Sequence, residues 1–198
     1  LLIKKNEMIG FLGSSGSGKS TLVDIITGLL NVSNGEISVD GKNIHSNLSA
    51  WQSKIGYVSQ STYLLDETLE KNIAFNLNEN DIDGEKIKRC LAMSDLDNLV
   101  MSLPDKKKSI VGEKGAKLSG GQIQRIGIAR ALYNNPEILI FDEATSALDL
   151  ITENKILDTI QKLKSKKTII IISHRVSAVK FCDNVYTLED GKLKNDEL

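Results

Sequence analysis

Short apolar runs and stretches with helical apolar spacing alternate along the first part of the chain. Met8 to Leu12 is an apolar run that predicts a strand, and Lys19 to Leu30 repeats apolar residues at the spacing of a helix. Gly35 to Gly41 alternates between two glycines, which predicts a short half-exposed strand, and Ile55 to Val58 predicts another. The order strand, glycine-rich loop, helix is the one that a phosphate-binding loop requires.

The pattern changes between residues 61 and 135, where β-branched runs are few. Helical patterns occur there at Thr68 to Phe75, Gly84 to Met93 and Gln122 to Tyr133. We therefore interpret residues 61–135 as a helical subdomain that is inserted into the rest of the chain.

Strand patterns return after Pro136. They cover Glu137 to Phe141, Thr168 to Ile172 and Asn184 to Leu188, with a charged helix predicted at about Thr152 to Leu163. Strands that alternate with helices predict an α/β fold with a mainly parallel sheet flanked by helices. We expect one domain over residues 1–198, in which residues 1–60 and 136–198 form the nucleotide-binding core.

Composition and charge narrow the classes of protein. The chain has 198 residues, 40% of them hydrophobic and 26% charged, which fits a single folded domain with a sizeable core. Its 25 basic and 26 acidic residues leave a net charge of -1, so charge gives no reason to expect nucleic acid as a partner. No apolar run approaches the roughly 18 residues of a membrane-spanning helix. The two cysteines, Cys90 and Cys182, lack ligand spacing and predict thiols in a reducing compartment.

The segment from Gly13 to Ser20 has the sequence of a phosphate-binding loop, or P-loop. Its glycines let backbone amides surround phosphates, and the following helix directs its positive N-terminus at the same anion. Lys19 adds a charge near the β- and γ-phosphates, and the Ser20 hydroxyl is predicted to bind Mg²⁺.

Polar residues follow two of the predicted apolar strands. Asp142 and Glu143 come after Ile138 to Phe141, and His174 comes after four consecutive isoleucines and Ser173. Ligands bind at the carboxyl ends of strands in open α/β sheets, so these side chains are candidates for the site. Asp142 suits a second anchor for hydrated Mg²⁺, and Glu143 suits the base that polarises an attacking water. The alternative is a carboxylate that only caps a helix.

A second helix start follows Leu118-Ser119-Gly120-Gly121-Gln122. The Ser119 hydroxyl and the glycine amides would form another anion site, although Lys19 already serves the phosphates. Two such sites on one small domain make sense if each nucleotide lies between the first loop of one subunit and the second loop of another. We therefore expect a head-to-tail dimer held together by ATP.

Together, these motifs resemble the ATP-binding cassette (ABC) family, and the resemblance covers Met8 to about Lys194. It implies a P-loop NTPase fold with a short antiparallel β element, and ATP and Mg²⁺ as cofactors. It also implies that His174 contacts the γ-phosphate and that Gln60 reaches Mg²⁺ and the attacking water, although Ser59 stands where the family usually has Pro. The implied catalytic residues are Lys19, Gln60, Glu143 and His174, and the implied Mg²⁺ ligands are Ser20, Gln60 and Asp142. The implied nucleotide contacts are Gly13, Ser14, Ser15, Gly16, Ser17, Gly18, Lys19, Ser20 and Thr21, with Ser119, Gly120, Gly121 and Gln122 from the partner.

Two further segments match the family. Ser146 to Asp149 resembles the D-loop, which crosses the dimer interface, and its alternative is an ordinary turn. Val111 to Gly115 resembles a segment of exporter-type cassettes whose acid, here Glu113, contacts the coupling helices of the membrane domain; its alternative is a surface acid in a glycine turn. Residues 55–75 are similar to bacterial lipid and glycolipid flippases.

The resemblance predicts an ATPase domain that powers an exporter or flippase. The expected partners are a second ABC ATPase domain and a transmembrane domain fused before Leu1, at the cytoplasmic face of a bacterial inner membrane. The alternatives are an importer's separate ATPase subunit or an ABC ATPase outside transport. The family's adenine-stacking aromatic residue would precede Leu1, and Trp51 cannot be assumed to replace it, so we expect weakened contacts to the base.

Overall fold

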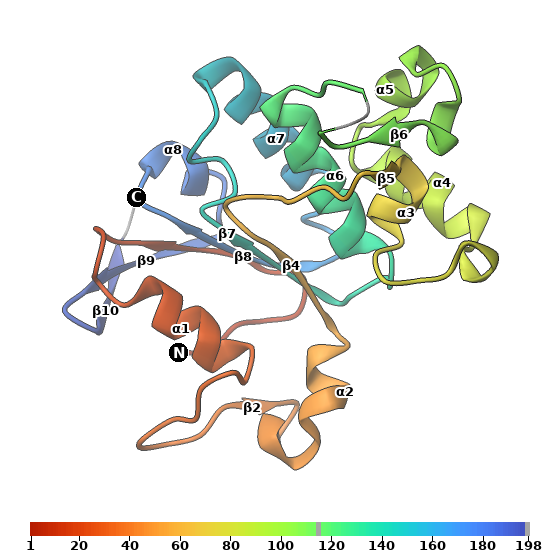
Figure 1. The fold of residues 1–198 in the computed structure, drawn as a ribbon. Coiled ribbons are helices and arrows are strands. Elements are labelled where there is room, and N and C mark those ends of the chain that lie inside the picture. The colour runs from red at the N-terminus through yellow and green to blue at the C-terminus, as the bar shows by residue number, and fades with distance from the viewer. Residues whose placement is uncertain (114–115, 197–198) are drawn as a thin grey trace.

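The computed structural model describes residues 1–113 and 116–196 (Figure 1). Its centre is a six-stranded sheet with the order β10-β9-β1-β8-β7-β4, in which only β10 is antiparallel to its neighbour. The strands are β1 (Met8–Leu12), β4 (Ile55–Val58), β7 (Ile138–Asp142), β8 (Thr168–Ser173), β9 (Asn184–Glu189) and β10 (Lys192–Asp196). The predicted mainly parallel sheet is therefore confirmed.

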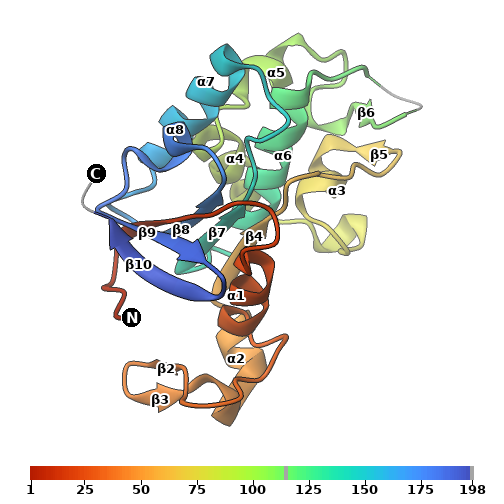
Figure 2. The same cartoon turned by 90° about the vertical axis from the view of Figure 1, so that its left-hand side faces the viewer.

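Helices cover both faces of this sheet. Figures 1 and 2 show α1 (Lys19–Ile26) on one face and α6 (Gly120–Leu132), α7 (Leu150–Gln161) and α8 (Val176–Val179) on the other. The central strands are apolar at consecutive positions because both of their faces are buried, and two core clusters lie on the two sides. The cluster under α1 includes Ile9, Phe11 and Val23.

The strand register brings the carboxyl ends of the central strands to one edge. Leu12 lies opposite Ser173, and Asp142 lies opposite Ile172. The loops after β1, β7 and β8 therefore leave the sheet side by side. This is the edge at which open α/β sheets bind their ligands.

A helical region packs beside β4. It contains α3 (Leu69–Ile73), α4 (Gly84–Met93), α5 (Asp97–Ser102) and α6. Its apolar side chains continue the core cluster that lies under α7. The sequence pattern does not predict two short strands there, β5 (Glu67–Thr68) and β6 (Ile110–Val111), which pair with each other.

Several predicted boundaries differ from the structure. The first helix ends at Ile26 rather than Leu30, because Gly28 adopts a positive φ of 77° that ends the helix. The alternating segment from Gly35 to Gly41 contains only β2 (Ser38–Val39), which pairs with β3 (Lys42–Asn43) across Asp40-Gly41, both with positive φ. Such a two-residue turn favours a hairpin. A 3₁₀ turn (Ile44–Asn47) and a short helix, α2 (Leu48–Gln52), follow this hairpin.

Among the described residues, no helix combines the length and the apolar composition needed to cross a bilayer.

Candidate functional site

The segment Gly13 to Gly18 forms a tight loop between β1 and α1. Gly16 and Gly18 have φ values of 81° and 102°, which residues other than glycine rarely adopt. A Cβ atom on Gly13 would lie 2.4 Å from the Ser17 hydroxyl and 2.8 Å from the carbonyl oxygen of Leu188. The loop therefore requires glycine at these positions, and it leads directly into α1.

The Lys19 side chain folds back over this loop. Its ammonium donates hydrogen bonds to the carbonyl oxygens of Gly13 (2.9 Å) and Ser14 (2.8 Å), and the side chain is only 7% exposed. The Ser17 hydroxyl is buried and has no hydrogen-bond partner among residues 1–113 and 116–196. A buried hydroxyl without a partner and a lysine at a helix N-terminus both suit a phosphate group.

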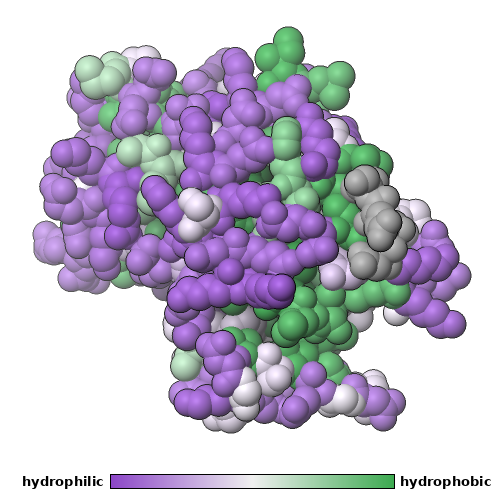
Figure 3. All heavy atoms as spheres, turned by 180° about the vertical axis from the view of Figure 1, so that it is seen from behind, coloured by the Kyte–Doolittle hydropathy of each residue, from purple (hydrophilic) through white to green (hydrophobic). Residues whose placement is uncertain are grey.

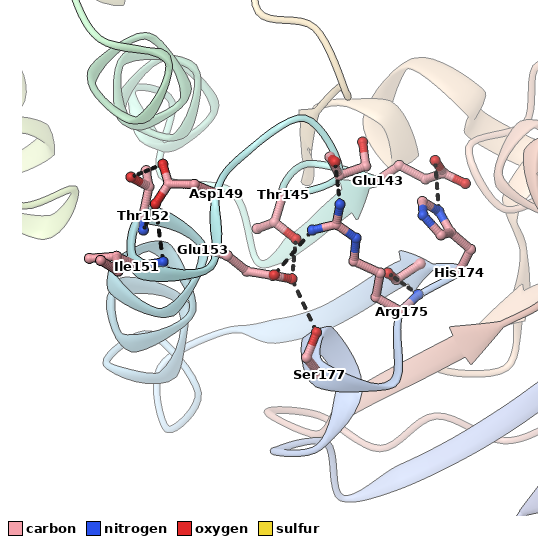
Figure 4. Close-up of polar contacts among 11 residues, drawn as sticks. Glu143, Thr145, Asp149, Ile151, Thr152, Glu153, His174, Arg175 and Ser177 are labelled. Carbon is pink, nitrogen blue, oxygen red and sulfur yellow. Dashed lines mark hydrogen bonds and ion pairs between the residues drawn. The ribbon is translucent and has the colours of Figure 1, made fainter.

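Glu143 and His174 face each other at the same sheet edge (Figure 4), and Lys19 lies beside Glu143. The Glu143 carboxylate lies 3.5 Å from the Lys19 ammonium and 3.3 Å from Nδ1 of His174. Glu143 adopts a positive φ of 49°, and its backbone N–H donates to the carbonyl of Ile172 on β8. This left-handed backbone, uncommon outside glycine, turns the chain as it leaves β7. The structure thus brings together three of the predicted catalytic residues.

Asp142, the last residue of β7, accepts a hydrogen bond of 2.8 Å from the hydroxyl of Tyr57 on β4. Partial burial, and then this contact with the carboxylate, raise the pKa of Tyr57. Sequence analysis missed Tyr57. The alternation of β4 could have placed it on a face of the sheet, but its meeting with Asp142 depends on β4 lying next to β7.

Gln60 is exposed and follows β4 directly, after Ser59. The buried side chain of Gln124 on α6 holds this segment, because its amide donates to the carbonyl of Ser59 (3.1 Å) and accepts from the Thr62 hydroxyl (3.3 Å). Gln124 is therefore a second residue that sequence analysis missed. It links the loop that carries Gln60 to the helix that begins at the second glycine motif.

Ser119 is the N-cap of α6. Its hydroxyl accepts from the backbone of Gln122 (3.3 Å), and the Gln122 side chain accepts from the backbone of Ser119 (2.8 Å), which forms a capping box. A Cβ atom on Gly121 would lie 2.4 Å from Thr152 on α7. The predicted partner-site residues Ser119 to Gln122 thus begin α6, on the opposite face of the sheet from α1 (Figures 1 and 2).

The predicted D-loop leads into α7 (Figure 4). Asp149 is the N-cap of this helix and accepts from the backbone of Ile151 and Thr152, and from the Thr152 hydroxyl at 2.7 Å. The hydroxyl contact lowers the pKa of Asp149. Within one chain, Asp149 therefore has the geometry of an ordinary turn residue that caps a helix, which is the alternative to the D-loop role.

Four further residues complete the comparison with the sequence. Ser20 and Thr21 are exposed at the start of α1. Trp51 is buried, and its indole N–H donates to the carbonyl of Ile26. Glu113 is exposed in a turn after β6, while Lys114 and Gly115 of its predicted coupling segment lie outside the described residues.

Comparisons with known proteins agree with this geometry. Residues 1–146 match the family model described as ABC transporter. The leukotoxin translocation ATP-binding protein LktB of Mannheimia glucosida is 43% identical over 194 residues, which are 98% of this chain and 27% of that protein. The LktB of a Pasteurella haemolytica-like species is 42% identical over 203 residues, which cover 100% of this chain and 28% of that protein.

A solved structure is also similar: a bacterial Atm1-family ABC exporter with ATP bound. It is 34% identical with a TM-score of 0.83, and the match covers 96% of this chain and 33% of that one. The chain therefore spans about a third or less of the length of these relatives. The match over residues 1–146, the parallel sheet and the P-loop beside Glu143 and His174 show that the chain belongs to the ABC transporter family.

Proposed function

We propose that this chain binds and hydrolyses ATP and thereby powers a membrane transporter of the exporter or flippase type. The observation that carries the proposal is the convergence of Lys19, Glu143 and His174 at one sheet edge. The Glu143 carboxylate lies 3.5 Å from the Lys19 ammonium and 3.3 Å from Nδ1 of His174. A lysine for phosphate, a carboxylate for water and an imidazole on the other side of that carboxylate suit hydrolysis of the γ-phosphate. The names of the relatives, which refer to translocation and export, support the choice of an exporter.

The proposed roles follow from the position of each group. The backbone from Gly13 to Gly18 surrounds the phosphates, Lys19 neutralises them, and Glu143 orients and polarises the attacking water. His174 holds the γ-phosphate side of the site, and Gln60 reaches the same water from β4. Ser20, Gln60 and Asp142 would hold Mg²⁺, a hard cation that prefers oxygen ligands and neutralises charge on the phosphates.

The second helix start argues for a dimer. Ser119 to Gln122 lie on α6, across the sheet from the P-loop, so one copy does not close its own site with them. In the proposed head-to-tail dimer, these residues contact the nucleotide that the partner's P-loop holds, and Asp149 lies in the loop between the two sites.

The test is ATP-dependent dimerisation of the Glu143→Gln variant, measured by light scattering with and without Mg-ATP. Without its carboxylate base, the variant should trap the ATP-bound dimer that the wild-type chain hydrolyses away. Lys19→Ala in the same background is the matched control, since it removes phosphate binding and should stay monomeric. A Glu143→Gln chain that binds ATP and stays monomeric would contradict the proposed interface.

The second proposed partner is a transmembrane domain, with the chain at the cytoplasmic face of a bacterial inner membrane. Exposed Glu113 supplies a carboxylate for the coupling helices. A separate groove of about 300 Å³ between β4 and the helical region offers an apolar and cationic surface, where the Arg130 guanidinium lies 4.7 Å from the Phe75 ring centre. In the full transporter, Glu113→Ala should lower transport per ATP hydrolysed and leave the ATPase of the 198-residue chain unchanged.

A further inference from the structure

A buried carboxylate lies behind the candidate site, and the functional roles above do not use it. Glu153, on the first turns of α7, is 1% exposed. One of its oxygens accepts from the hydroxyls of Thr145 (3.2 Å) and Ser177 (3.3 Å), and the other accepts from the Arg175 guanidinium (3.2 Å), as Figure 4 shows. A charge taken out of water is costly unless it is paired and hydrogen-bonded, so the buried Glu153 carboxylate depends on these contacts.

Ser177, one of the groups that contact Glu153, lies on α8, and the other two come from loops. Thr145 follows Glu143 by two residues, and Arg175 follows His174 directly. Arg175 also crosses from its own loop to the other, because its guanidinium donates to the carbonyl of Ser146 at 2.8 Å. The guanidinium fork therefore contacts both α7 and the loop after β7, while the backbone of Arg175 belongs to the loop after β8.

This arrangement constrains Glu143 and His174, the first residues of the two loops. The pairing of β7 with β8 fixes the backbone as far as Asp142 and Ile172. Beyond the paired strands, the Glu143 and His174 side chains must still meet at 3.3 Å. The guanidinium, anchored on the buried carboxylate, limits how far the two loops can move apart.

We propose that Glu153 and Arg175 are positioning residues that hold Glu143 and His174 at their working separation. The inference rests on the proposed ATPase function. Neither residue touches the reacting atoms; both act through the loops after β7 and β8. The competing explanation is a buried ion pair that stabilises the fold and has no separate effect on hydrolysis.

The Arg175→Lys variant separates these explanations. Lysine keeps the positive charge for Glu153, but a single ammonium lacks the planar fork that also reaches Ser146. The variant should therefore fold and bind ATP with a KM within about threefold of wild type, while kcat falls at least about tenfold. Glu153→Gln should have the same signature with a larger loss of stability.

Glu70 provides a matched control away from the site. It is another buried carboxylate, 5% exposed, on α3, and its partner is the Lys107 ammonium at 3.1 Å. Glu70→Gln should lower thermal stability and leave kcat within about twofold of wild type. A Glu70→Gln chain whose kcat falls as far as that of Glu153→Gln would overturn the positioning role, because any buried charge would then have the same effect.

A double variant tests whether Arg175 acts through Glu143. In the Glu143→Gln background, Arg175→Lys should cause less than about a twofold further loss of residual kcat, because effects on one catalytic unit do not add. A full tenfold loss in that background would overturn the proposal. A raised KM with unchanged kcat in the Arg175→Lys single variant would also overturn it.

A crystal structure of Arg175→Lys tests the geometry without any activity. We expect the Glu143 to His174 contact to lengthen beyond 3.3 Å, and an unchanged contact would overturn the proposal. If the wild-type chain bound ATP and did not hydrolyse it, the proposed function would fail, and this structure would still decide the positioning role.

Discussion

Gly127 lies on the face of α6 that packs against the loop after Gln60. A Cβ atom added there would lie 2.3 Å from the hydroxyl oxygen of Thr62, 3.1 Å from its methyl carbon and 3.3 Å from its Cβ. Because threonine is branched at Cβ, rotation of this side chain exchanges one close contact for another. We therefore predict that Gly127→Ala destabilises the protein, although alanine favours a helix.

The expected magnitude follows from three contributions. Alanine in place of glycine within a helix favours folding by about 1 kcal/mol. Overpacking at a buried site costs about 1–3 kcal/mol. Displacement of Thr62 also removes the 3.3 Å hydrogen bond from its hydroxyl to Gln124, which contributes about 1 kcal/mol. The net expectation is a loss of about 2 kcal/mol in the free energy of unfolding.

Urea unfolding of four chains tests this reasoning: wild type, Gly127→Ala, Thr62→Ala and the double variant. Removal of the Thr62 hydroxyl and methyl should relieve the clash. The free energy of unfolding of the double variant should therefore exceed that of Gly127→Ala by at least about 1 kcal/mol. Gly84→Ala is the control, since its Cβ would lie 3.6 Å from the Lys107 ammonium, an ordinary contact. A Gly127→Ala chain that is as stable as wild type would refute the packing explanation.

Three shorter predictions concern other parts of the site and core. Tyr57→Phe removes the hydrogen bond to Asp142 and should weaken Mn²⁺ binding in the presence of ATP a few-fold, measured by electron paramagnetic resonance, with little change in melting temperature. Burial raises the pKa of the Cys182 thiol to about 12, so its alkylation by iodoacetamide at pH 8, followed by mass spectrometry, should be at least about a hundredfold slower in the native than in the denatured chain. The hydrogen bond from the Thr152 hydroxyl lowers the pKa of Asp149, so its stabilising effect is present above the usual aspartate pKa of about 4 and is lost as the pH falls through the lowered value. Melting curves of wild type and Asp149→Ala should therefore differ at pH 7 and converge in acid, and a constant difference would contradict the capping role.

The site residues that could be predicted from sequence belong to motifs that come after apolar strands. Lys19, Glu143 and His174 belong to short motifs next to β1, β7 and β8, and the parallel pairing of these strands brings the three side chains together. Local sequence patterns indicate both the motifs and the strands that they follow. The same holds for the boundaries of β1, β4 and α4, which the structure reproduces as predicted.

The contacts that could not be predicted join segments far apart in the chain. Tyr57 meets Asp142 across 85 residues because β4 pairs with β7, and no local pattern specifies that neighbour. Glu153 lies in a helix whose charged pattern suggests exposure to water, and its burial results from two loops that close over it. Gln124 likewise gains its role when α6 packs on the loop after β4.

The contact between Lys19 and Glu143 also suggests an order of events. The ammonium bonds the loop carbonyls and lies against the carboxylate that we propose as the base, so both groups are engaged with the protein itself. In the proposed reaction, a bound phosphate would compete with Glu143 for the Lys19 ammonium and would leave the carboxylate available to accept a bond from water. Lys19 would thereby couple the two events, because the Glu143 carboxylate would become available as a base only when a phosphate is bound for the water to attack.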